Sequence, residues 1–149
     1  VPFDSRICYG KIHKAMLYIR RGNARFLGTN PDAASPVLDT GELAPGGGTF
    51  VAAVACAAEQ TPTICGKPSA VLGEILVRER GLEPARTLMV GDRIDTDVAF
   101  GRNAKFQTLL VMSGATSGVG AVLAAASKEK RLLPDFIGLD VSVLLPRRA

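Results

Sequence analysis

The sequence of 149 residues has no tryptophan, a single histidine (His13) and few aromatic side chains, which make up 5% of its residues. One histidine, with no cysteines at ligand spacing, argues against a zinc site. The shortage of aromatics argues against nucleic-acid binding, which favours basic residues interleaved with aromatic ones. Part of the formal net charge of +4 lies in the run 128–131 and in Arg147 and Arg148, which we interpret as a solvated loop and a chain end.

Long apolar runs are also missing. No run is long enough to cross a bilayer, and no signal peptide is present, so we predict no membrane partner and a cytoplasmic location. Cysteine is scarce: Cys56 and Cys65 lie in apolar surroundings, Cys8 makes the count odd, and no Cys-x-x-Cys spacing occurs. This pattern predicts buried, reduced thiols. The chain begins with Val1 rather than methionine, which predicts a processed chain or a fragment.

The order of the predicted elements indicates an α/β fold. Apolar residues recur at i, i+3, i+4 and i+7 from Ile12 to Ile19, which predicts an amphipathic helix ended by Gly22. Further helices are expected over 49–58, from about 69 to Gly81, from about 95 to 103, and over 120–126 and 141–145. Strands are expected over 25–27, 63–65, 87–90, 107–112 and 136–137, with a loop over 28–48. Beyond Thr61 the alternation predicts a parallel, Rossmann-like sheet with right-handed crossovers.

A cluster of carboxylates follows the apolar strand at 88–90. Gly91 allows a tight turn, and Asp92, Asp95 and Asp97 come within six positions. Sites in parallel α/β sheets lie at the carboxyl ends of strands, and clustered oxygen ligands there suit Mg²⁺. The alternative is that these residues only cap the helix that follows.

Lys67 stands at the end of the strand predicted just before. We expect this strand to neighbour the 87–90 strand, so that the lysine faces Asp92 and can neutralise a phosphate or hold carboxylates in place. The alternative is an ordinary surface lysine. The Gly46–Gly48 run lacks the pattern of a phosphate-binding Walker loop, and we interpret it as a flexible helix entry.

Several stretches resemble those of haloacid-dehalogenase-superfamily (HAD) phosphatases, above all the eukaryotic phosphoglycolate phosphatase, pyridoxal phosphatase and p-nitrophenylphosphatase group. They are Gly-Lys-Pro-Ser at 66–69, the segment 88–98, and the segment 108–117, which ends in Ser117. The segments 26–32 and 133–136 are similar to a cap strand with its loop and to the C-terminal segment of that group. The resemblance implies part of an α/β cap domain over 1–61 and the C-terminal part of a HAD-type core over 62–149.

That resemblance also implies a chemistry. It implies Mg²⁺-dependent hydrolysis of small phosphate monoesters through an aspartyl-phosphate, with phosphoglycolate, pyridoxal phosphate or p-nitrophenyl phosphate as the type of substrate. Lys67 matches the lysine that steadies the phosphate and the nucleophile. Asp92 matches the metal-binding aspartate, and Asp97 matches the acid that supports the metal site, indirectly or through water. The partners implied are a small phosphorylated metabolite and a second copy, bound through the cap in a homodimer.

The sequence departs from the family pattern in one important respect. The family's nucleophile lies in an Asp-x-Asp-Gly motif, and none occurs in the 149 residues. Lys105 also stands where glycine is usual, which would affect the turn after Asn103. The alternative function is therefore a catalytically inactive truncated remnant or a small-molecule-binding module. A receiver-like module would need a phosphoacceptor aspartate and a different lysine placement.

Overall fold

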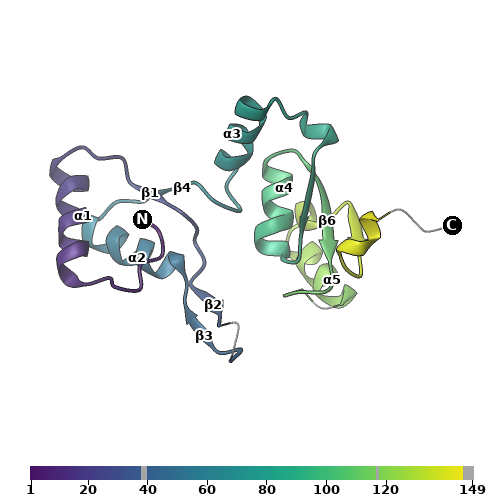
Figure 1. Cartoon of the computed structure of the whole chain (residues 1–149), viewed down its shortest axis with the longest axis horizontal. Coiled ribbons are helices and arrows are strands. Elements are labelled where there is room, and N and C mark those ends of the chain that lie inside the picture. Colours follow the sequence, from purple (N-terminus) through teal and green to yellow (C-terminus); the bar gives the residue numbers. More distant parts are fainter. Residues whose placement is uncertain (38–39, 117, 146–149) are drawn as a thin grey trace. The chain divides into compact units, whose positions relative to one another are not determined.

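The computed structural model describes residues 1–37, 40–116 and 118–145. They fall into two compact units, Val1–Gly66 and Lys67–Ala149 (Figure 1). Ser117, Arg147 and Arg148 lie outside the described residues. Among the helices of the described ranges, none combines the length and the apolar character needed to cross a membrane. Both units combine helices with parallel strand pairs, which confirms the predicted α/β class.

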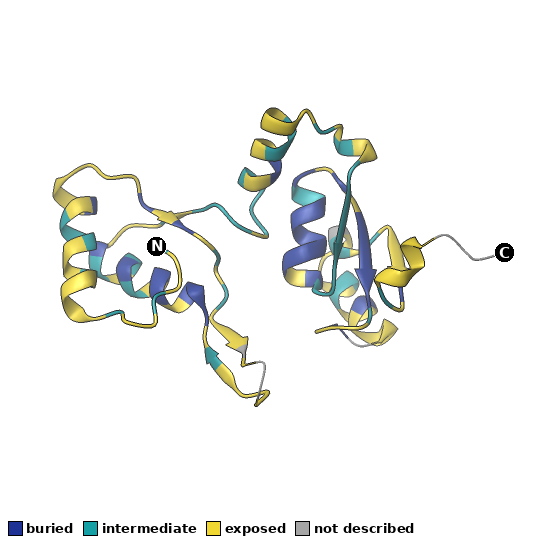
Figure 2. Cartoon of the chain, in the orientation of Figure 1, coloured by how far each residue is buried: buried dark blue, intermediate teal, exposed yellow. Residues whose placement is uncertain are grey.

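The first unit is built on two packed helices, α1 (Tyr9–Arg21) and α2 (Gly47–Ala58). Helix α1 follows the predicted periodicity and ends at Gly22, with Arg20 and Arg21 in its last turn, where cations suit the helix dipole. The apolar faces meet in a small core, shown in dark blue in Figure 2. Its buried members are Ile19, Phe26, Val51, Val54 and Ala58.

The predicted loop over 28–48 is wrong in one part, because it contains a short hairpin. Strands β2 (Ala34–Pro36) and β3 (Leu43–Pro45) pair antiparallel. Gly41 adopts a φ of 69°, a conformation that glycine reaches without steric cost. Strands of three residues are too short to display a period-2 pattern, so the breakers around them dominated the sequence signal.

The strand before Lys67 also differs from prediction. Strand β4 (Thr63–Ile64) pairs parallel with β1 (Leu27–Gly28) of the first unit. The Cys65 and Gly66 amides extend this pairing, donating to Gly28 and Thr29 at 2.9 and 2.8 Å. The predicted pairing of this strand with the 87–90 strand is therefore wrong. The same bonds keep residues 63–66 with the first compact unit, which ends at Gly66.

The predicted burial of the cysteines is wrong as well. Cys56 is exposed and Cys65 is half-buried. Beyond the first turn of α2, the buried side chains are those of Phe50, Val51, Val54 and Ala58, and a helical period places residue 56 off that face. Apolar neighbours in sequence did not decide which side of the helix the thiol occupies.

The second unit contains a parallel sheet in the order β5–β6–β7. Its strands are β5 (Leu88–Gly91), β6 (Gln107–Val111) and β7 (Phe136–Gly138). The central strand β6 is buried from Thr108 to Val111, as a parallel strand covered on both faces should be. Within the described residues, β5 pairs with β6 alone, so one edge of β5 is open.

Helices precede and connect these strands. They are α3 (Val71–Arg80), a π-helical turn (Ile94–Val98) that runs into α4 (Ala99–Asn103), and α5 (Val119–Lys128). Single 3₁₀ turns cover Pro84–Arg86, Lys130–Leu132 and Val141–Leu144. The expected helix from about 95 to 103 thus begins as a wider turn, of a kind often found at functional sites.

The turn after Asn103 has the geometry that a glycine would favour. Lys105 has a φ of 61°, and its amide donates to Arg102 O at 3.2 Å while that of Phe106 donates to Gly101 O at 2.8 Å. These two bonds form the Schellman pattern that commonly ends helices. The lysine therefore occupies the left-handed position without breaking the turn.

A carboxylate contact joins β6 to the segment before β7. Asp135 Oδ2 accepts from the Thr108 amide at 2.8 Å and from its hydroxyl at 2.9 Å, and the Asp135 amide donates back to that hydroxyl at 3.0 Å. Arg102 pairs with Asp135 Oδ1 at 2.8 Å. Desolvation acts to raise the pKa of Asp135, but the Thr108 bonds and Arg102 outweigh it and hold the pKa below its usual value.

We expect Asp135→Ala to lower the free energy of unfolding by about 1–3 kcal/mol, because it leaves the amide of fully buried Thr108 without an acceptor. Because the folded-state pKa is depressed, this contribution is complete above the unfolded value of about 4 and disappears as the pH falls through the folded value. Urea titrations at several pH values measure it. Asp95→Ala, at an exposed ion pair, is the control and should cost less than about 1 kcal/mol. An equal loss of unfolding free energy in the two variants would contradict the stabilising role given to the Asp135–Thr108 contact.

Candidate functional site

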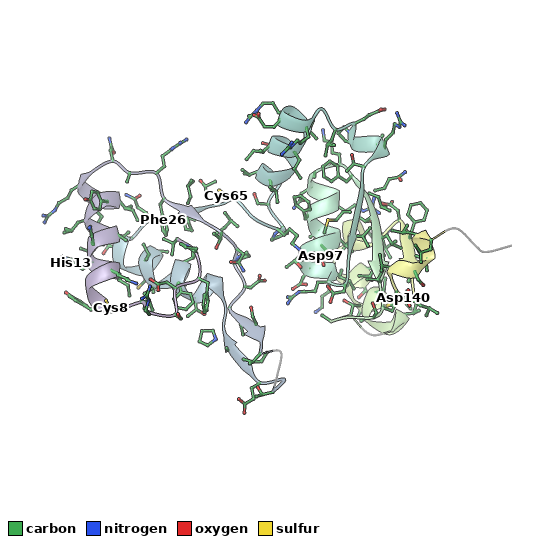
Figure 3. The ribbon with its side chains drawn as sticks, in the orientation of Figure 1. Cys8, His13, Phe26, Cys65, Asp97 and Asp140 are labelled. Atoms are coloured by element: carbon green, nitrogen blue, oxygen red, sulfur yellow. The ribbon has the colours of Figure 1, made fainter. Side chains whose placement is uncertain are left out.

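The site begins with an ion pair at the start of the second unit. Lys67 Nζ donates to Asp97 Oδ1 at 2.6 Å. The lysine side chain is 45% exposed, whereas that of Asp97, which is labelled in Figure 3, is 6% exposed. The carboxylate is therefore fixed inside the unit while the ammonium reaches solvent. A cation held in this way can meet an anionic ligand without losing its protein partner.

Asp97 also organises the turn that follows β5. Its Oδ2 atom accepts from the Asp92 and Arg93 amides, both at 3.1 Å. Gly91 makes this possible, because a Cβ there would lie 2.3 Å from Asp97 Cγ. Both oxygens of Asp97 are thus occupied by protein donors. The carboxylate thus satisfies two amides just before the helical turn, whereas no side chain caps the turn itself.

Asp92 occupies the end of β5. Its Oδ2 atom accepts from the Ala115 amide at 2.6 Å, and its carbonyl accepts from the Thr116 amide at 3.0 Å. Gly114 allows the contact, because a Cβ there would lie 2.0 Å from Asp92 Oδ2. Among the described residues, no hydrogen bond reaches Asp92 Oδ1. None of the residues that the structure describes therefore occupies this second carboxylate oxygen of Asp92.

The third carboxylate of the cluster is engaged elsewhere. Asp95 forms a two-point pair with Arg93, at 3.1 Å to Nε and 2.7 Å to Nη2. The Arg93 hydrogen bond lowers the pKa of Asp95. Because this pair is exposed, its contribution to stability is small. The structure brings the Lys67 ammonium and the Asp92 amide onto the carboxylate of Asp97. Asp95 lies outside that arrangement.

The arrangement can supply part of a Mg²⁺ site. Within the residues that the structure describes, no group of three His, Cys, Asp or Glu side chains is placed to hold a metal ion. A Mg²⁺ ion, however, usually takes only one or two protein carboxylates and completes its shell with water and phosphate oxygens. Asp92 Oδ1 fits that role. Asp97 does not fit as a direct ligand, because both its oxygens already accept hydrogen bonds.

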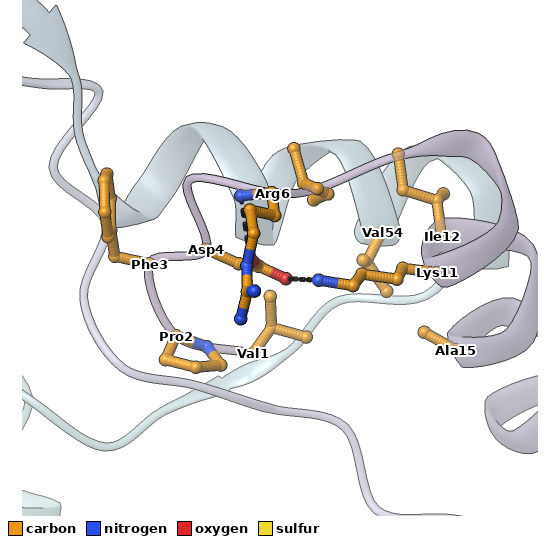
Figure 4. Close-up of a pocket in the computed structure, with 10 residues that line it drawn as sticks. Val1, Pro2, Phe3, Asp4, Arg6, Lys11, Ile12, Ala15 and Val54 are labelled. Atoms are coloured by element: carbon orange, nitrogen blue, oxygen red, sulfur yellow. Dashed lines mark hydrogen bonds and ion pairs between the residues drawn. The ribbon is translucent and has the colours of Figure 1, made fainter.

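Two other features belong to the first unit. His13 stacks on Tyr9 of the same helix, α1, at 5.8 Å between ring centroids. The same unit has a cavity of about 390 Å³, where Lys11 donates to Asp4 at 2.6 Å (Figure 4). That bond, with the Arg6 amide, holds the pKa of Asp4 below its usual value. Neither feature includes Lys67, Asp92 or Asp97.

Residues 64–139, just over half of the chain, match the HAD-hydrolase-like family. The chain belongs to the HAD-like hydrolases. The matched residues include Lys67, Asp92 and Asp97, and they contain the whole β5–β6–β7 sheet of this HAD unit. The family predicted from the sequence is therefore confirmed.

Individual relatives agree with this family. The HAD chain is 36% identical to glycerol-3-phosphate phosphatase of Rattus norvegicus, over 98% of the chain and 46% of that enzyme. It is 37% identical to chloroplastic phosphoglycolate phosphatase 1A of Arabidopsis thaliana, over 100% of the chain and 40% of that enzyme. The structure of a p-nitrophenyl phosphatase from Archaeoglobus fulgidus matches with a TM-score of 0.80 and 30% identity, over 94% of the chain and 52% of that structure. The chain spans about half the length of these relatives.

Sequence reasoning missed one residue that borders the site. Asn103 Nδ2 donates to the Pro68 carbonyl at 2.6 Å, next to Lys67. The residues lie 35 positions apart, and an asparagine at a helix end has many ordinary roles. No pattern within the sequence could have connected the two.

Proposed function

We propose that this chain forms the lysine and metal half of a Mg²⁺-dependent phosphomonoesterase acting on small phosphorylated metabolites. The observation that carries the proposal is the arrangement around Asp97. One oxygen of this buried carboxylate holds the half-exposed ammonium of Lys67, and the other holds the backbone of Asp92. The Lys67 ammonium and the Asp92 carboxylate, with its second oxygen, therefore lie on either side of the Asp97 carboxylate that holds both residues. That combination suits a phosphate ester with its divalent cation.

Each residue has a distinct part in this proposal. Lys67 places positive charge where the phosphate gains negative charge in the transition state, and Asp97 keeps that charge from swinging into solvent. Asp92 offers Oδ1 to Mg²⁺, while the Ala115 amide fixes its other oxygen. When bound, Mg²⁺ would neutralise phosphate charge and orient the phosphate oxygens.

The attacking group has to come from outside these 149 residues. No Asp-x-Asp-Gly motif is present, and both oxygens of Asp97 are occupied. We infer that the complete reaction passes through an aspartyl-phosphate on a carboxylate contributed by the part of the relatives that this chain does not cover. In the proposed assignment, residues 1–61 belong to a cap and 62–149 to the core. A cytoplasmic location and a homodimer through the cap belong to the same proposal.

The second candidate is a non-catalytic remnant or small-molecule-binding module. The observation in its favour is the open edge of β5, whose residues Leu88–Gly91 are all half-buried rather than buried. A sheet without its neighbour can still fold and bind an anion at Lys67. The two candidates differ in whether turnover appears once the missing half is supplied.

A chimera tests the proposal. This chain replaces the matching segment of rat glycerol-3-phosphate phosphatase, which is 46% of that enzyme. We expect Mg²⁺-dependent hydrolysis of p-nitrophenyl phosphate, and about 100-fold lower kcat in Lys67→Ala because the phosphate loses its fixed cation. Lys14→Ala, on α1, is the charge-matched control and should keep full activity. A chimera that unfolds cooperatively yet shows no turnover above the buffer blank would favour the non-catalytic candidate.

A further inference from the structure

The turn that carries Lys67 is held by a second side chain of the same helical segment. Asn103 is half-buried and is the last residue of α4. Its Nδ2 atom donates to Pro68 O at 2.6 Å, one residue beyond the lysine. Lys67 is therefore held at two points. Asp97 binds its ammonium, and Asn103 binds the backbone beside it.

The two anchors belong to one rigid stretch. Asp97 lies in the π-helical turn and Asn103 at the end of α4, which follows it without a break. The Lys105 and Phe106 amides close the end of α4, and the Phe106 ring packs edge-on against Phe100 at 6.0 Å between centroids. The spacing between the anchors is thus set by backbone geometry and by a buried aromatic contact.

We propose that Asn103 is a positioning residue for Lys67. Lysine carries its charge on a flexible four-carbon stem, so the place of its ammonium depends on where its backbone is fixed. The Asn103 bond fixes Pro68 O, and with it the point from which the Lys67 stem reaches Asp97. The role in catalysis rests on the proposed function above, whereas the tether itself does not.

Amine acylation measures the tether directly, in the chimera described above and after its cooperative unfolding has been verified. Lys67 must leave Asp97 before its nitrogen can attack acetic anhydride. The readout is the acetylation rate of Lys67 relative to that of Lys128, an exposed lysine at the end of α5 in the same unit, quantified by peptide mass spectrometry. We expect Asn103→Leu, which removes the donor at similar volume, to raise this ratio about threefold or more. Asn103→Gln, which keeps an amide, should return the ratio toward that of the unchanged chain.

Arg102→Ala is the matched control. Arg102 is the adjacent residue and also donates to a backbone carbonyl, Leu133 O, at 3.1 Å from Nε, but toward the Asp135 contact rather than toward Lys67. It should lower the melting temperature without changing the acetylation ratio. An unchanged ratio in Asn103→Leu, or an equal rise in Arg102→Ala, would overturn the proposal.

The activity of the chimera separates this proposal from the proposed function. We expect Asn103→Leu to lower kcat about tenfold while KM for p-nitrophenyl phosphate changes less, because the lysine is displaced rather than removed. If Lys67→Ala leaves kcat unchanged, the proposed function fails. The acetylation ratio still decides whether the Asn103 hydrogen bond to Pro68 positions Lys67. If Lys67→Ala lowers kcat and Asn103→Leu does not, the positioning role is refuted.

Discussion

Purified alone, the 149-residue chain is expected to release no p-nitrophenol from p-nitrophenyl phosphate above background, with or without Mg²⁺. Phosphoryl transfer by this route needs an attacking carboxylate. The chain has no Asp-x-Asp-Gly motif, and Asp97 is committed to Lys67 and to two amides. Metal alone cannot replace the missing nucleophile.

The same preparation should be poorly stable or should self-associate. Strand β5 pairs with β6 alone among the described strands, and an open strand edge offers unpaired amides and carbonyls to another copy. Sedimentation velocity across a range of concentrations measures association, and a phosphatase assay on the same samples measures turnover. The control is Asp92→Asn in the same chain. Turnover well above that control would mean that we have misplaced the nucleophile.

Asp92→Asn in the chimera is expected to lower Mg²⁺-dependent kcat/KM by about a thousandfold or more, since the charge that holds the metal disappears and metal stabilisation is worth several kcal/mol. The amide retains a side-chain oxygen that can still accept from Ala115, so the turn at Gly114 should survive and the melting temperature should change little. Steady-state kinetics over a Mg²⁺ titration, with thermal melts, measure both quantities.

Asp95→Asn is the control for this prediction. It makes the same chemical change three residues away, at a carboxylate paired with Arg93 and 66% exposed. The control should keep its turnover and its Mg²⁺ dependence. If Asp92→Asn retains the Mg²⁺ affinity and turnover of the parent chimera, Asp92 serves only to hold the turn, and the capping alternative explains the whole cluster.

Much of the second unit could be predicted from the sequence, because its signals are local. The apolar run before Gly91 and the one after Gln107 became β5 and β6. Gly81 ended α3 in the left-handed conformation, with a φ of 63°. Spacing also singled out Lys67, Asp92 and Asp97 as one group, and the structure brings them together, although by a route other than neighbouring strands of one sheet.

Only the tertiary structure could decide the rest, because it depends on contacts between distant residues. Hydrogen bonding to β1 placed β4 in the first unit, and the same kind of long-range contact joined Asp135 to Thr108 and Asn103 to Pro68. The carboxylates at 92, 95 and 97 look equivalent in sequence, since their type and spacing are alike. What separates them is which oxygens the fold occupies: both of Asp97, both of Asp95 by Arg93, and one of Asp92.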